Sequence, residues 1–278
     1  MTGRPAPETP GAGPAGRRER RALWDRPWFL RSVTLFVFVA GWQVFAMING
    51  GLMFPTAFGT IQSLGELLVD PELWSALWVS NQALLIGFPL AIVTGIPLGL
   101  YMGRARSAEK FVDPYMNILL VTPMAALTPL LLMSVGIGLT SRVIFVYIFA
   151  LPMIVVHART GIRQVDISLV EMSRSLRASE LQIWRRIFIP SALPAIMTGI
   201  RIGTGRAVTG MILAELLLVS VGIGGMVLEF RGFFASEKLY AAVIIVVIES
   251  LLLVELARYA ERRLAPWAVT GNERAGKE

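Results

Sequence analysis

The chain contains no cysteine and only one histidine among its 278 residues. Without cysteine it can form neither a disulfide nor a thiolate metal site. The single histidine, His157, cannot build a metal centre alone, so we expect none. Charged residues are also scarce, at 16% of the chain, whereas soluble domains usually carry about 25%. This composition does not fit an ordinary soluble protein.

Apolar residues are abundant and clustered instead. They make up 55% of the chain, and its mean hydropathy is +0.63. Several clusters approach the roughly 20 residues that a helix needs to cross a bilayer. Because backbone polar groups inside lipid must be paired within the segment, we expect these spans to be helices. The sequence therefore predicts an all-α polytopic membrane protein with six transmembrane helices, at Leu30–Ile48, Asn81–Met102, Pro114–Met133, Val143–Val156, Leu193–Val219 and Leu239–Leu256.

The net charge of +7 is distributed unevenly between the segments that join these spans. Residues 1–31 carry seven arginines and residues 157–190 carry six, but residues 49–82 carry no lysine or arginine. Basic and non-basic loops alternate, as the positive-inside rule requires of a membrane protein. We therefore expect both termini and the insert at 161–190 to face the cytoplasm. The basic charge reflects topology, so we expect no nucleic-acid partner.

The chain divides into a membrane domain and two tails. Residues 1–22 are rich in Pro, Gly, Ala and Arg, and we expect a disordered basic cytoplasmic tail there. The transmembrane domain is predicted to cover residues 23–267, with the insert at 161–190, and a disordered tail is predicted at 268–278. Residues 60–78 are expected to form short amphipathic helices on the outer face.

Small residues four apart and prolines punctuate the predicted spans. Gly95, Gly99 and Gly103 give a tandem GxxxG spacing in the second span, and Gly199 and Gly203 repeat it in the fifth. Such spacing allows helix backbones to approach closely in lipid, and packing within one chain is more frequent than a dimer contact. The spans also contain prolines that can kink their helices, at Pro89, Pro97, Pro123 and Pro129.

Four ionisable residues are predicted to lie at membrane depth: Arg201, Arg206 and Glu215 on the fifth span, and Glu249 on the sixth. Charged groups at such depth usually pair with one another or line a polar pathway. One interpretation is an ion pair between Glu249 and either Arg201 or Arg206. The other is an arginine that faces a translocation path, where it would favour an anion.

Motifs for catalysis or nucleotide binding are nearly absent. Gly271, Gly276 and Lys277 match the spacing GxxxxGK, but Glu278 follows where a P-loop has Ser or Thr. No helix follows that could present its N-terminus to phosphate. We therefore expect no nucleotide site and no enzymatic activity in this chain.

The insert carries the most specific pattern in the sequence. Glu171, Met172 and Ser173 stand where the EAA loop of binding-protein-dependent ABC importer permeases has E-A-A, and Arg177 stands in place of its usual glycine. Ile187, Ile189 and Pro190 match the I-x-L-P that ends that loop. Further segments resemble the branch that handles nitrate, sulfonates and taurine: 122–143, 161–166, 201–216 and 261–267.

The resemblance covers roughly residues 30–267 and implies a defined set of partners. These are a second permease copy, two cytoplasmic ATPase subunits that hold ATP and Mg²⁺, an external solute-binding protein, and the lipid of a bacterial inner membrane. It also implies that the insert docks on the ATPase as a coupling helix, through Glu171, Met172, Ser173, Ser175, Leu176, Arg177 and Ala178. We further expect the helix before Arg177 to continue through it, because arginine favours helix more than glycine does.

Two other classes stay open at this level. A secondary transporter would need acidic residues that couple to an ion gradient, and would not need the insert. A membrane-embedded enzyme would need clustered His, Asp or Glu at a membrane face, and the sequence shows no such cluster. The substrate is not specified by the sequence; the arginines at depth favour a small organic or inorganic anion, whereas similar permeases also handle neutral or cationic solutes.

Overall fold

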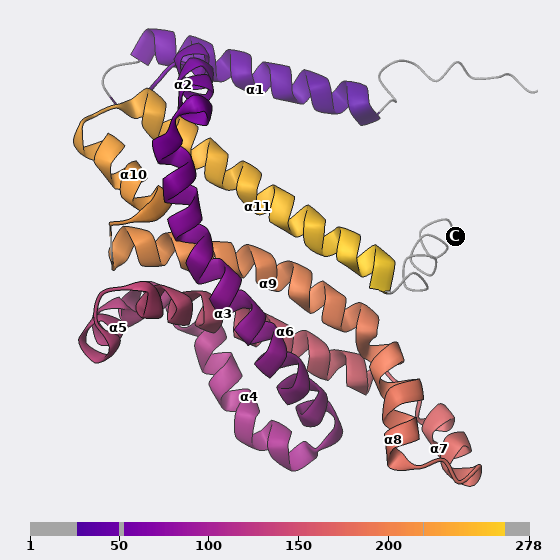
Figure 1. The fold of residues 1–278 in the computed structure, drawn as a ribbon. Helices are drawn as coiled ribbons and strands as arrows, with labels where there is room; N and C mark the ends of the chain where they lie inside the picture. The colour runs from indigo at the N-terminus through magenta and orange to yellow at the C-terminus, as the bar shows by residue number, and fades with distance from the viewer. Residues whose placement is uncertain (1–26, 50–52, 219, 265–278) are drawn as a thin grey trace, which may run out of the picture.

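The computed structural model describes residues 27–49, 53–218 and 220–264, and in these ranges the regular structure is entirely helical. Figure 1 shows long helices packed side by side, with a shorter helical hairpin extending from one end. The helices are α1 (Pro27–Asn49), α2 (Ala57–Val69), α3 (Pro71–Arg104), α4 (Arg106–Val121), a 3₁₀ turn (Met124–Leu127), α5 (Thr128–Val135), α6 (Leu139–Arg163), α7 (Ile167–Ser175), α8 (Glu180–Ile183), a π turn (Trp184–Phe188), α9 (Ile189–Leu217), α10 (Gly222–Gly232) and α11 (Ser236–Leu264).

The predicted all-α membrane fold is confirmed. Among the described residues, five helices are long and apolar enough to cross a bilayer, and the bent pair α4 and α5 makes a sixth if it is counted as one span. The tails predicted at 1–22 and 268–278, and the GxxxxGK segment, lie outside the described residues. So does Val219, the predicted end of the fifth span.

The third span is broken rather than continuous. The chain bends by 97° between Arg106–Val121 and Ala125–Val135. Thr122 precedes Pro123 and has an extended backbone, as residues before proline usually do. The predicted continuous helix Pro114–Met133 is therefore wrong, because the proline ends α4 instead of only kinking it.

The second span begins earlier than predicted. Asp70 is the N-cap of α3, and its side chain accepts a hydrogen bond from the Glu72 backbone N–H at 2.9 Å. Pro71 follows at the first helical position. A backbone N–H at that position has no partner within the helix, so the missing N–H of proline costs nothing there. The expectation of short outer helices over 60–78 holds only for α2, because α3 already starts at Pro71 and continues for 34 residues.

The fourth span is longer than the predicted Val143–Val156. In the structure α6 runs for 25 residues and lies at the centre of the bundle, with half of its most apolar window buried. Phe145, Val146, Ile154 and Val155 are almost completely buried, and α3 and α9 pack on its two sides. The charged residues near both ends of α6 are paired, Arg142 with Glu215 and Arg159 with Asp113, so they shorten the apolar run without ending the helix.

The glycines at GxxxG spacing lie where α3 and α9 contact α6. A methyl group at Gly99 would come within 2.4 Å of the Val155 carbonyl oxygen, and one at Gly103 within 2.7 Å of Ile162 Cβ. A Cβ added at Gly95 would lie 3.1 Å from Ile154 Cγ2. On α9, a Cβ added at Gly199 would lie 2.7 Å from His157 Cβ, and one at Gly203 would lie 3.2 Å from Ile154 Cγ1. These five glycines therefore pack against helix α6 of their own chain.

Candidate coupling surface and membrane-depth charges

The insert is a hairpin of α7 and α8 that extends from the end of the bundle (Figure 1). Asp166 caps α7, accepting a hydrogen bond from the Ser168 backbone N–H at 2.9 Å, and hydrogen bonds from Ser168 lower the pKa of this exposed carboxyl below its usual value. Ser179 starts α8 with a capping box that involves Gln182. Sequence-local caps therefore define where both short helices begin.

The second helix of the hairpin is not separate from the membrane span. In the structure α8 continues through the π turn at Trp184–Phe188 directly into α9. The three segments together form one helical span, Glu180–Leu217, of 38 residues. Single π turns inside α-helices often occur at functional sites. The hairpin is therefore helically continuous with the membrane domain.

The turn between α7 and α8 is a left-handed helix cap at Arg177. Its φ is +57°, its N–H donates to the Arg174 carbonyl at 2.9 Å, and the Ala178 N–H donates to the Ser173 carbonyl at 3.0 Å. This is the hydrogen-bond pattern of a Schellman motif, in which glycine is the preferred residue. The expectation that the helix continues through Arg177 is wrong. The turn keeps the conformation that a glycine would favour, although the residue is arginine.

The inner face of the hairpin is fixed to the bundle by apolar contacts. Val170, Ile183 and Phe188 are buried in one cluster with residues of α6 and α9, including Ala158, Ile162, Ala192 and Ile196. The Arg104 guanidinium carbon also lies 5.7 Å from the centroid of the Phe188 ring, within cation–π range. Because both helices contribute to this cluster, the hairpin should move with the bundle rather than independently.

The outer face is exposed. Glu171, Met172, Ser175, Leu176 and Arg177 are exposed, and we call these five residues the exposed patch. Leu176 is 76% exposed, and Met172, one helical turn before it, is also exposed. Among the other predicted coupling residues, Ser173 and Ala178 are half-buried. The patch offers apolar side chains next to charges of both signs, a composition suited to a partner surface.

An ion cluster that we did not predict lies near the same end of the bundle. Arg159 on α6 pairs with Glu109 and Asp113 on α4, and Arg163 also pairs with Glu109. The sequence contains a signal for it: the two acids and the two arginines are each four residues apart, so each pair lies on one helix face. The cluster joins the broken third span to the central helix.

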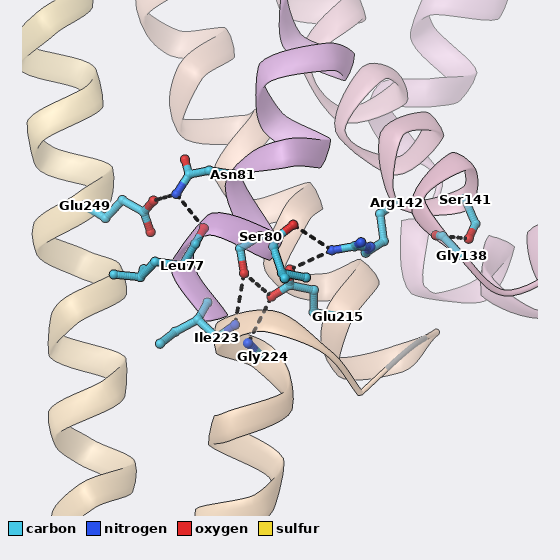
Figure 2. Close-up of polar contacts among 11 residues, drawn as sticks. Leu77, Ser80, Asn81, Gly138, Ser141, Arg142, Glu215, Ile223, Gly224 and Glu249 are labelled. Atoms are coloured by element: carbon cyan, nitrogen blue, oxygen red, sulfur yellow. Dashed lines mark hydrogen bonds and ion pairs between the residues drawn. The ribbon is translucent and has the colours of Figure 1, made fainter. Parts of the chain in front are cut away.

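At the other end of the bundle, Glu215 is completely buried in a polar network (Figure 2). Its carboxylate accepts hydrogen bonds from the Ser80 hydroxyl and the Gly224 N–H, each at 2.9 Å, and lies 3.5 Å from Arg142 Nη1. Arg142 also donates to the Val79 carbonyl at 2.9 Å. The network joins α3, α6, α9 and α10. Sequence reasoning missed Arg142, because it stands at the edge of an apolar run, where a charge usually belongs to a loop.

The pairing that we considered between Glu249 and Arg201 or Arg206 is wrong. Glu249 accepts a hydrogen bond from the Asn81 side chain at 2.6 Å, and Arg201 pairs with Glu261 at 3.2 Å. Arg201 lies twelve residues into α9 and Glu261 three residues from the end of α11, so the helices are offset by roughly 13 Å. Comparing depths along α9 and α11 as if their cytoplasmic ends were level therefore paired the wrong residues.

Arg206 differs from the other membrane-depth charges because it is exposed and has no ion-pair or hydrogen-bond partner among the described residues. It lines a pocket of about 280 Å³ between α4, α6 and α9, together with Pro123, Phe149, Pro152 and Leu213. The described residues contain no cluster of three or more side chains that could hold a metal ion.

These features define a polytopic α-helical membrane protein in which one span extends into a hairpin with an exposed patch. The sequence profile of the binding-protein-dependent transport system inner membrane component matches residues 95–266, more than half of the chain. The chain therefore belongs to that family of ABC importer permeases.

Individual relatives agree with this assignment. The taurine transport system permease TauC of Escherichia coli is 31% identical over 72% of this chain and 72% of its own length. The nitrate import permease NrtB of Synechocystis is 27% identical over 94% of this chain and 98% of its own. Among solved structures, a MetNI methionine ABC transporter chain matches with a TM-score of 0.58 at 22% identity, covering 72% of this chain and 98% of that one, and so shares the fold.

Proposed function

We propose that this chain is the permease subunit of an ATP-driven importer for a small organic or inorganic ion of the nitrate, sulfonate or taurine type. Two copies would form the pathway, two separate ATPase subunits would bind ATP and Mg²⁺, and an external solute-binding protein would deliver the substrate. The observation that carries the proposal is the exposed patch on a hairpin that is helically continuous with span α9.

The coupling step follows from how the hairpin is held. The ATPase would receive the exposed patch in a groove, while Val170, Ile183 and Phe188 keep the hairpin fixed to the bundle. When the groove moves, α8 would push on α9 through the π turn, and α6 would follow through its tight glycine contacts with α9. Such rigid-body motion is an established way to convert a local displacement into domain rearrangement. The pathway would thus open alternately to each side of the membrane.

The same proposal assigns a topology. The hairpin and both termini would face the cytoplasm of a bacterial cell, and the α9–α10 turn with the Glu215 network would lie toward the outer face of the inner membrane. The uneven distribution of basic residues supports this orientation.

Affinity purification followed by transport tests the proposal. The tagged chain, co-expressed with an ABC ATPase subunit and a solute-binding protein, should co-purify with the ATPase and catalyse uptake into proteoliposomes that requires ATP in their lumen. A ligand screen on the binding protein would identify the substrate. Uptake driven by an ion gradient without ATP, with no ATPase bound, would instead indicate a secondary transporter.

A further inference from the structure

Arg206 occupies an unusual environment for a charged residue in a membrane protein. It lies on α9 about 20 Å beyond Leu193, counted along the helix, and its side chain is exposed. The described residues provide no carboxylate for it, whereas Arg142 and Arg201 each have one. A charged side chain at such depth faces protein or water rather than hydrocarbon, because transfer into lipid is costly.

The face of α9 around Arg206 is open in this chain. Gly205 has no atom within 4 Å of where a Cβ would be placed, and both Ile202 and Thr209 are exposed. Residues 202, 205, 206 and 209 recur at helical spacing and so form one stripe. The neighbouring face of α9 is closed, since Gly199, Gly203 and Gly210 all contact α6 closely. The open stripe is therefore the side of α9 that a water-filled path or a second copy would cover.

The adjoining pocket has one sign of charge. Among the described residues that line it, Arg206 alone is charged, and the other walls are apolar side chains, prolines and Thr122. The broken third span forms one wall at Pro123, where the chain bends. A cationic guanidinium between apolar walls attracts an anion more strongly than it would in bulk water, and its planar donors match sulfonate or nitrate oxygens.

From this arrangement we propose that Arg206 is an anion-binding residue of the translocation path, with Thr209 beside it on the same open stripe. The inference rests on the proposed function and deepens it, because it assigns recognition of the substrate charge to a residue of the permease itself. It requires water to reach the stripe, and this can be tested without knowing the natural substrate.

The absence of cysteine makes a direct test available. Thr209→Cys introduces a single thiol three residues from Arg206, on the same helix face. The full chain, in membranes with its ATPase, is treated with two methanethiosulfonate reagents, one carrying a sulfonate and the other a trimethylammonium group. Each rate is divided by that reagent's rate with a free thiol, and Leu251→Cys on the exposed face of α11 gives the background.

We expect the sulfonate reagent to be favoured at the Thr209→Cys thiol on the order of tenfold while Arg206 is present, because a nearby unit charge attracts one reagent and repels the other. Adding Arg206→Gln should bring the ratio of the two normalised rates, sulfonate reagent over trimethylammonium reagent, close to one. Arg206→Lys should retain the preference for the sulfonate reagent. Reaction no faster than background with both reagents, or an equal ratio with and without Arg206, would overturn the inference. ATPase co-purification is scored on the same samples, so failure of the importer assignment is recognised separately.

Discussion

Arg142 on α6 and Glu215 on α9 lie 3.5 Å apart, with 7% and 0% of their side chains exposed. The pair does not stand alone, because Ser80 and the Gly224 N–H complete the hydrogen bonds of the carboxylate (Figure 2). Ser80 also accepts a hydrogen bond from the Ile223 N–H at 2.9 Å. The start of α10 is therefore fixed to three spans, at the end of the bundle opposite the hairpin.

We predict that removing one member of this network destabilises the protein strongly. Glu215→Ala leaves Arg142 buried without its carboxylate, which typically costs about 3–5 kcal/mol. Thermal stability in detergent should fall sharply, whereas Arg258→Gln, which breaks the exposed pair with Glu255, should change it by less than about 1 kcal/mol. Equal stability of the two variants would show that the network contributes no more than a surface pair.

Close helix contact at the glycines gives a second prediction. Gly99→Ala places a methyl group 2.4 Å from the Val155 carbonyl oxygen, so α3 and α6 must separate, at a cost of about 1–3 kcal/mol. Gly205→Ala is the matched control: it lies on α9 with open space around its Cβ position, and alanine should stabilise the helix slightly. The comparison uses thermal unfolding of both variants in the same detergent. Destabilisation by Gly205→Ala alone would contradict the assignment of the contact faces.

The general fold was predictable from the sequence, because the length of an apolar run depends only on local composition. The tertiary pairing was not predictable in the same way. Glu215 was recognised as a membrane-depth charge, but Arg142 was not recognised as its partner, since the register of α6 against α9 depends on how glycines and large side chains interdigitate. The same limit produced the wrong Glu249 pairing. At Arg177, helix propensity favoured continuation, but the Schellman hydrogen bonds and the caps at Asp166 and Ser179 determined the turn.

The left-handed backbone at Arg177 leads to a third prediction. Glycine pays no Cβ penalty there, so Arg177→Gly should stabilise the turn by about 1 kcal/mol, and Arg177→Asn should be tolerated. Arg177→Val should disrupt the hairpin, because β-branched residues disfavour positive φ. The readout is the amount of ATPase that co-purifies with each variant. Loss of ATPase from the Gly variant would show that the arginine side chain, and not the backbone turn, is what the partner needs.

Topology supplies a fourth prediction. If basic residues orient the chain, the start of α3 and the hairpin lie on opposite sides of the membrane. Single cysteines introduced by Ser75→Cys and Ser175→Cys, both at exposed positions, should then react with an impermeant thiol reagent from opposite sides. In intact spheroplasts only the thiol at position 75 should be labelled, and permeabilisation should reveal the other. Labelling of both from one side would contradict the proposed orientation.

The central claim is that the exposed patch couples this chain to an ATPase, and the most direct measurement is ATPase co-purification with Leu176→Asp. Leu176 is 76% exposed, so aspartate should leave the fold intact, as thermal unfolding would verify. A charge placed in an apolar contact should weaken docking by about 2 kcal/mol, roughly thirtyfold in affinity.

Glu171→Lys should act in the same direction, and Glu229→Lys on α10 serves as the matched charge reversal at an exposed site outside the hairpin. We predict that ATPase is lost from Leu176→Asp and Glu171→Lys and retained with Glu229→Lys. Full ATPase retention and normal uptake in both patch variants would contradict the account.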